Sequence, residues 1–179
     1  LEAVGEGVTR VSPGDEVFGI VRGSFAEKAL AAERLLVAKP TTVSWEQAAA
    51  APTSTITAFD ALRSRTAAGT RVLVLGAGGG VGHLSVQVAR ALGAEVTAAT
   101  SDPAFAASLG AARVIDYRTE RLDGMYDVIL DVGGRRPVSC GLCSPRRAPL
   151  CSWAAREAGR SWAGCSGSSS SRRSPRRSS

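Results

Sequence analysis

The first 139 residues of this 179-residue chain contain no cysteine, and the whole chain has one histidine, His83. A zinc site of the usual spacing needs clustered Cys and His ligands, so the sequence predicts no metal in this part. No apolar run reaches about 18 residues, and no basic and then apolar leader opens the chain, which argues against a membrane span and a signal peptide. We therefore expect a cytoplasmic protein with no membrane partner.

All four cysteines follow residue 139, at Cys140, Cys143, Cys151 and Cys165. The Cys-x-x-Cys pair suggests a metal or redox site, but its partners are badly spaced, and we interpret the four thiols as incidental. The formal charge of +6 is equally uneven, because residues 1–133 carry 12 Lys and Arg against 15 Asp and Glu, a balance of −3, and residues 134–179 carry +9. The acidic body argues against a nucleic-acid partner.

Residues 1–43 are punctuated by turn signals such as Pro-Gly-Asp and are otherwise strand-like, so we expect the end of a small β-rich domain. The chain starts at Leu1 and not at Met, and its first residues already resemble a strand, which predicts a fragment without its N-terminal part. Ser44 and Gln47 form a capping-box pattern that starts a helix, and a second helical stretch is expected after Pro52.

Strands and helices alternate from residue 71 onward, which predicts an α/β fold with a Rossmann-type parallel sheet over residues 44–134. The expected strands are 71–76, 95–100, 113–116 and 127–132, and the expected helices are 81–92 and 103–109.

Glycines dominate the turn between the first strand and its helix, with the spacing Gly76-x-x-Gly79-x-x-Gly82 and further glycines at Gly78 and Gly80. Backbone N–H groups at the start of a helix can bind a pyrophosphate where no side chain blocks them. The strict G-x-G-x-x-G pattern is not met, since valine follows Gly80. The surrounding strands and helix still favour dinucleotide binding over a purely structural turn.

Thr100 and Ser101 end the second strand, where a carboxylate favours NAD and small hydroxyl residues leave room for a 2′-phosphate. We therefore expect NADPH to bind, with NADH the less favoured alternative. Asp102 is expected to cap the helix that starts at Pro103, although it could instead reach the ribose. His83 could contact a phosphate, but we interpret it as a solvated helix residue.

Several stretches in order, "VGEGVTRVSPGDEVFG", "GSFAEKALA", "LVAKPTTVSWEQAAAAP", "GAGGGVGHLSVQVARALGAEV" and "RVIDYRTE", resemble the medium-chain dehydrogenase/reductase superfamily over residues 1–134. They are most similar to its zinc-independent, alcohol dehydrogenase-like branch of quinone oxidoreductases and enoyl reductases. The resemblance implies a GroES-like barrel domain, here only its end at residues 1–43, and a truncated Rossmann domain. It also implies hydride transfer from NADPH to a quinone, enone or small carbonyl, and a possible homodimer.

By position, the resemblance implies that Gly78, Gly79, Gly80 and Val81 hold the pyrophosphate. It likewise places Ser101 at the 2′-phosphate, Tyr117 at the adenosine and Thr57 near the nicotinamide, although Tyr117 could equally be an ordinary strand-end aromatic.

The chain departs from the family pattern at two places: no basic residue follows Ser101 closely, and Lys28 replaces an aromatic residue. Only residues 20–22 stand where zinc-dependent relatives insert a four-cysteine lobe, so we expect no structural zinc. No catalytic residue is predicted.

Residues 135–179 lose all periodicity and end in "CSGSSSSRRSPRRSS", which predicts a disordered segment. Read from the third base of each codon, Pro145 to Ala155 can encode Pro-x-Gly-Thr-Leu-Val-Leu-Val-Gly-Gly, a strand that the family pattern calls for here. We hypothesise a frame slip between about residues 134 and 140, with a genuine basic arm as the alternative, and resequencing the encoding DNA tests it. Loss of the strand that the family pattern calls for would leave strand 127–132 as an exposed apolar edge. We would then expect this chain to be poorly soluble and inactive.

Overall fold

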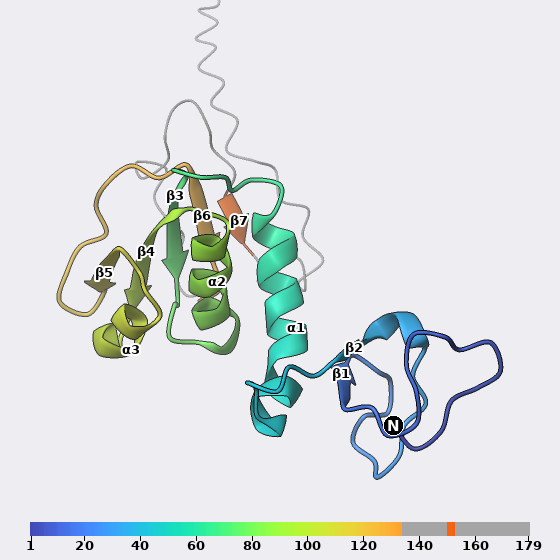
Figure 1. The fold of residues 1–179 in the computed structure, drawn as a ribbon. Helices are drawn as coiled ribbons and strands as arrows, with labels where there is room; N and C mark the ends of the chain where they lie inside the picture. Colours follow the sequence, from blue (N-terminus) through green and yellow to red (C-terminus); the bar gives the residue numbers. More distant parts are fainter. Residues whose placement is uncertain (134–149, 153–179) are drawn as a thin grey trace, which may run out of the picture.

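A five-stranded parallel sheet forms the centre of the molecule, with the strand order β5-β4-β3-β6-β7 (Figure 1). The computed structural model describes residues 1–133 and, by backbone alone, residues 150–152. The strands are β3 (Arg71–Leu75), β4 (Glu95–Thr100), β5 (Arg113–Asp116), β6 (Val128–Asp131) and β7 (Leu150–Ser152). All adjacent pairs run parallel, so the predicted Rossmann-type sheet is confirmed, and the strand limits agree to within one residue for the four predicted strands.

Alternate residues of the strands enter two separate apolar clusters, because successive side chains of a strand point to opposite faces. One cluster joins Val72, Val74, Val96, Ala98, Val128 and Leu130 to residues of the helices. The other joins Leu73, Ala99, Ile115 and Ile129 to Tyr126, which comes from the segment before β6. Burial on both faces explains why these strands are nearly continuous apolar runs.

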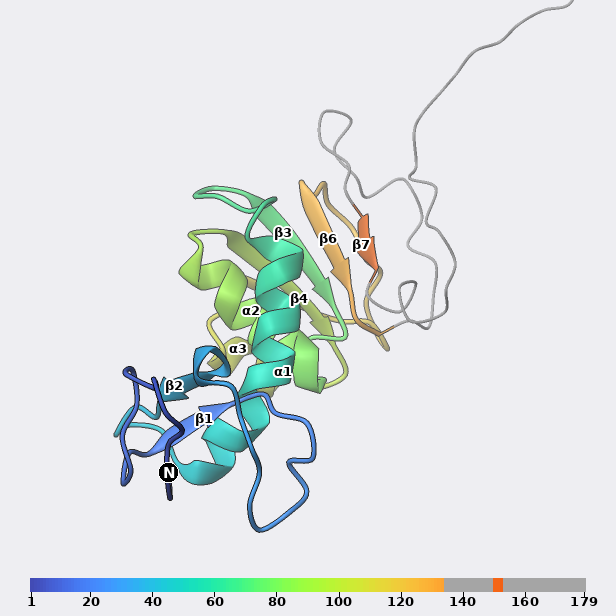
Figure 2. The same cartoon turned by 90° about the vertical axis from the view of Figure 1, so that its right-hand side faces the viewer.

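Three helices pack on the first of these faces (Figure 2). They are α1 (Trp45–Leu62), α2 (Gly80–Ala91) and α3 (Pro103–Ser108), and α1 lies beside α2. Leu62 of α1, Val86 of α2 and Ala106 of α3 are fully buried there. None of the helices in the described residues is long and apolar enough to cross a membrane.

Helix α1 begins with the predicted capping box. The Ser44 hydroxyl accepts a hydrogen bond from the Gln47 backbone N–H at 3.2 Å, and the Gln47 side chain accepts one from the Ser44 N–H at 3.0 Å. The prediction of two helical stretches separated at Pro52 was wrong, because α1 continues through the proline. Pro52 removes one N–H donor and its ring crowds the Ala48 carbonyl, but burial of Ala48 and Ala58 on either side of it favours one continuous helix.

Replacing Ser44 by Ala removes one half of the capping box and leaves the Gln47 N–H without its acceptor. We expect the free energy of unfolding to fall by about 1 kcal/mol. Urea denaturation followed by circular dichroism measures the change. Thr42→Ala, an exposed change in the turn just before the helix, is the matched control and should leave the midpoint unchanged. Equal stability of the Ser44 variant and the original chain would contradict the capping role.

The N-terminal residues form a small lobe with one antiparallel pair of strands, β1 (Val17–Gly19) and β2 (Leu36–Ala38). A short 3-10 helix at Glu33–Leu35 comes directly before β2. Lys39 connects this lobe to α1. Its ammonium group pairs with Glu16 at 3.2 Å and lies 5.0 Å from the centre of the Trp45 ring. That residues 1–43 are the end of a barrel domain stays a prediction.

Strand β6 is held between two neighbours. On one side β6 is hydrogen-bonded to β3. An ion pair of 3.0 Å between Arg71 and Asp127 joins the two strands where they begin. On the other side Ile129–Asp131 pairs with β7, a strand that the sequence interpretation did not include. The expected exposed apolar edge at residues 127–132 was therefore wrong, because β7 covers it. The remainder of the predicted disordered or out-of-frame tail lies outside the described residues.

Candidate cofactor site

The glycine-rich turn connects β3 to α2 at the carboxyl end of the sheet. Gly76 has a positive φ of 79°, which a side chain would strain. The N–H groups of Gly76 and Ala77 both donate to the Ala99 carbonyl, at 3.0 and 3.1 Å, so the turn is anchored to the end of β4. Gly79 is the N-cap of α2 and contributes no side-chain cap.

Three of the glycines lie where an added Cβ atom would meet a close neighbour within the protein itself. A Cβ atom on Gly82 would lie 2.0 Å from the Gly76 carbonyl oxygen, and one on Gly78 would lie 2.9 Å from the Thr100 hydroxyl. A Cβ on Gly76 would lie 3.1 Å from the Gly133 nitrogen, just beyond β6. These glycines allow the turn, α2 and the ends of β4 and β6 to approach one another.

Gly79 and Gly80 are different, because both are exposed and packing does not forbid a side chain there. The nearest atom to a Cβ on Gly79 would be 3.4 Å away, and to one on Gly80 it would be 3.8 Å away. The two residues leave an uncovered backbone surface at the first turn of α2. That surface fits a pyrophosphate, since it offers N–H donors and the positive end of the helix dipole. Val81, the next residue, is half-buried.

Helix α1 borders this surface through Ser54. The hydroxyl of Ser54 is the nearest atom to a Cβ built on Gly80. Thr57 lies one helical turn later on the same side of α1, and its hydroxyl donates to the Thr53 carbonyl at 2.8 Å. Thr57 thus lies on the side of α1 that borders the glycine turn. Sequence interpretation missed Ser54, which only the packing of α1 against α2 reveals.

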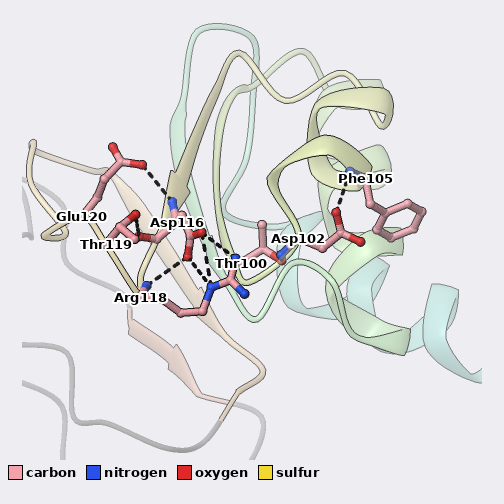
Figure 3. Close-up of polar contacts among 7 residues, drawn as sticks. All are labelled: Thr100, Asp102, Phe105, Asp116, Arg118, Thr119 and Glu120. Carbon is pink, nitrogen blue, oxygen red and sulfur yellow. Dashed lines mark hydrogen bonds and ion pairs between the residues drawn. The ribbon is translucent and has the colours of Figure 1, made fainter.

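The end of β4 carries the residues predicted to contact the adenosine ribose. Thr100 is buried, and its hydroxyl accepts a hydrogen bond from the Asp102 N–H at 3.0 Å, so it shapes the turn beside Gly78. Ser101 is exposed. The Asp102 carboxylate accepts a hydrogen bond from the Phe105 N–H at 3.1 Å, which confirms that it caps α3 (Figure 3).

His83 contacts both the backbone of the glycine turn and helix α3. Its Nδ1 lies 2.9 Å from the Gly79 carbonyl oxygen, and its ring lies against Phe105 with 6.0 Å between the ring centres. These contacts give the imidazole a structural role at the base of the turn.

The end of β5 adds a charged pair that sequence interpretation did not include. Arg118 binds the Asp116 carboxylate through Nη2 at 2.7 Å and through Nε at 2.9 Å (Figure 3). The hydrogen bonds from Arg118 lower the pKa of Asp116, and the same pair raises the pKa of Arg118. Tyr117, between them, is exposed. The signal in the sequence was an Asp and an Arg two residues apart at the end of a strand.

Among residues 1–133 and 150–152, no group of three or more His, Cys, Asp or Glu side chains could hold a metal ion. Cys140, Cys143 and Cys165 lie outside these residues.

Comparisons with known proteins agree with this arrangement. Residues 80–140 match the family model described as zinc-binding dehydrogenase. The 2-methylene-furan-3-one reductase of Solanum lycopersicum is 36% identical over 150 residues, which cover 74% of this chain and 39% of that protein. The chloroplastic NADPH-dependent alkenal/one oxidoreductase of Arabidopsis thaliana is 36% identical over 149 residues, which cover 73% and 39%.

Among solved structures, the quinone oxidoreductase of Coxiella burnetii superposes with a TM-score of 0.65 at 33% identity. The match covers 73% of this chain and 45% of that one. The chain thus spans less than half the length of these relatives. With the parallel sheet and the glycine turn, these likenesses confirm the resemblance inferred from the sequence, to the quinone oxidoreductase branch of the medium-chain dehydrogenase/reductase superfamily.

Proposed function

We propose that this chain binds NADPH and that, in its complete form, it is a zinc-independent oxidoreductase that reduces a quinone, an enone or a small carbonyl. The uncovered backbone at Gly79 and Gly80, beside the end of β4, is the observation that carries the proposal. The names of the relatives, which include an NADPH-dependent alkenal/one oxidoreductase and a quinone oxidoreductase, support the substrate class.

Several of the predicted residues have a task in this proposal. NADPH supplies the hydride when it is bound. The N–H groups of Gly80 and Val81 bind the pyrophosphate, and Thr57 borders the nicotinamide from α1. Ser101 donates to the 2′-phosphate, while the exposed Tyr117 ring packs against the adenosine. The chain's own contribution is to bind and orient the cofactor beside the acceptor.

The proposed absence of a structural zinc rests on the short connection after β1, where only residues 20–22 stand in place of the four-cysteine lobe of zinc-dependent relatives. Metal analysis of the purified chain tests it, and one equivalent of bound zinc would refute it. We also propose a cytoplasmic location, from the absence of cysteine before residue 140, and a homodimer for the complete form.

The main competing function is nucleotide binding without catalysis. Calorimetric titration of the purified 179-residue chain with NADPH and with NADH is the first test. We expect NADPH to bind more tightly, and tighter binding of NADH would refute the choice of cofactor. Loss of NADPH absorbance on addition of a quinone then identifies an enzyme, whereas binding without turnover favours the non-catalytic alternative.

Gly80→Val tests the proposed pyrophosphate surface. Its side chain would cover the exposed first turn of α2 without a clash at Cβ, so the free energy of unfolding should change by less than about 1 kcal/mol. We expect the NADPH dissociation constant, measured by calorimetry, to rise about tenfold or more, which corresponds to about 1.4 kcal/mol. Ala91→Val, an exposed change at the other end of α2, is the matched control. Unchanged NADPH affinity of the Gly80 variant would place the nucleotide elsewhere.

A further inference from the structure

The end of β4 offers a hydroxyl group at Ser101 but no basic side chain nearby in the sequence, since residues 102–110 contain no Lys or Arg. A 2′-phosphate carries close to two negative charges, and burying it against hydroxyl groups alone leaves that charge without a counterion. A basic group for NADPH must therefore come from another element. In the sheet, β5 is the neighbour of β4, and Thr100 is paired with Asp116 across the two strands.

Arg118 follows the end of β5, and its side chain turns back to the Asp116 carboxylate (Figure 3). Its side chain is more than half exposed, at 58%. After the dominant interaction with Asp116, the carboxylate of Asp102 at the end of β4 also raises the pKa of Arg118. Asp116, which binds the Arg118 guanidinium group, is paired with Thr100 in the sheet, so the positive charge lies beside the end of β4.

The Asp116 carboxylate fixes the position of this guanidinium group. It also accepts a hydrogen bond from the Arg118 backbone N–H at 3.0 Å, which closes a tight Asx turn. The turn is held further by a hydrogen bond of 3.1 Å from the Asp116 N–H to the Glu120 carboxylate. The side-chain bonds to Asp116 use Nε and Nη2, so Nη1 is outside the pair and can donate to a phosphate oxygen.

We infer that Arg118 is the residue that selects NADPH over NADH, with its guanidinium group binding the 2′-phosphate together with Ser101 and with Asp116 as its positioning residue. This inference rests on the proposed function, because it needs a nucleotide bound at the glycine turn. The inference places the basic group in the turn after β5 and not among the residues that follow Ser101.

A substitution of Asp102 tests the inference independently of any change at Arg118. Its carboxylate caps α3 through the Phe105 N–H, and asparagine caps helices about as well as aspartate. Asp102→Asn should therefore preserve the local structure while removing one negative charge from the neighbourhood of the proposed phosphate site. The NADPH affinity should rise severalfold, and the NADH affinity should not change.

The decisive experiment is calorimetric titration of the 179-residue chain and its Arg118→Gln variant with NADPH and with NADH. We expect the dissociation constant for NADPH to rise at least tenfold and that for NADH to change less than twofold. Arg113→Gln is the matched control, since Arg113 is also an exposed, ion-paired arginine of β5, bound to Asp123 at 2.7 Å, but at the opposite end of the strand. It should change neither constant.

Each outcome separates this inference from the proposed function. Equal losses for both nucleotides in Arg118→Gln, or no loss for either, would overturn the role of Arg118 while leaving the nucleotide site intact. Absence of binding of either nucleotide to the original chain would overturn the proposed function itself, and the inference with it. Weaker NADPH binding in Asp102→Asn would also contradict the inference, because the removed charge opposes the phosphate.

Discussion

A Gly82→Ala variant is expected to lose about 3 kcal/mol of its free energy of unfolding, although the same change usually stabilises a helix by about 1 kcal/mol. The new Cβ would lie 2.0 Å from the Gly76 carbonyl oxygen, 2.8 Å from its carbonyl carbon and 2.9 Å from the Ala77 Cα. All three are backbone atoms of the turn between β3 and α2. They cannot move apart unless α2 moves away from the sheet.

Urea denaturation followed by circular dichroism measures this loss, and Gly80→Ala is the matched control. Gly80 is in the same helical turn, but its nearest atom to a new Cβ is a side-chain hydroxyl at 3.8 Å. That variant should be as stable as the original chain or slightly more so. A Gly82 variant with increased stability would show that helix propensity outweighs the contact, and that α2 does not approach the turn so closely.

Leu130→Ala is expected to lower the free energy of unfolding by a similar amount, about 3 kcal/mol, for a different reason. Leu130 is 1% exposed and stands in the middle of β6, opposite Val74 of β3, in the larger apolar cluster. Removing its branched side chain leaves a cavity between the sheet and its helices. Neighbouring side chains fill such a cavity only in part, so the lost contacts are not recovered.

Leu30→Ala is the matched control for this loss, because Leu30 is 96% exposed in the N-terminal lobe. The identical substitution there should change the free energy of unfolding by less than about 0.5 kcal/mol. Urea titrations of both variants give the comparison. A cost below about 1 kcal/mol at Leu130 would mean that β6 is not packed into the core.

The sheet could be predicted from the sequence because its strands are apolar runs separated by strong turn signals. The capping box at Ser44 and the cap at Asp102 were equally visible, since both depend on residues three apart. Pro52 misled the interpretation because a proline ordinarily ends a helix, and only the packing of α1 keeps it continuous. Strand β7 has no apolar periodicity, and its pairing with β6 was not visible from its own residues.

The candidate site also has features that the sequence predicted and features that it could not predict. The glycines were found because their spacing follows from local backbone needs, but the sequence does not distinguish Gly82, which the helix contact requires, from Gly80, which packing leaves free. The position of Arg118 was not predictable, since it depends on β5 lying beside β4. Contacts between neighbouring strands are set by the order of the sheet, which no local pattern encodes.

The central place of β3 has a consequence for the order in which the molecule assembles. Arg71 meets Asp127 across a separation of 56 residues, whereas β3 and β4 are joined by a connection less than half as long. Closing the longer loop costs about 0.7 kcal/mol more chain entropy, so β3, α2 and β4 should associate before β6 arrives. Damage to β6 should then accelerate unfolding and leave the folding rate almost unchanged, and stopped-flow measurements on Leu130→Ala would show the change in the unfolding arm alone.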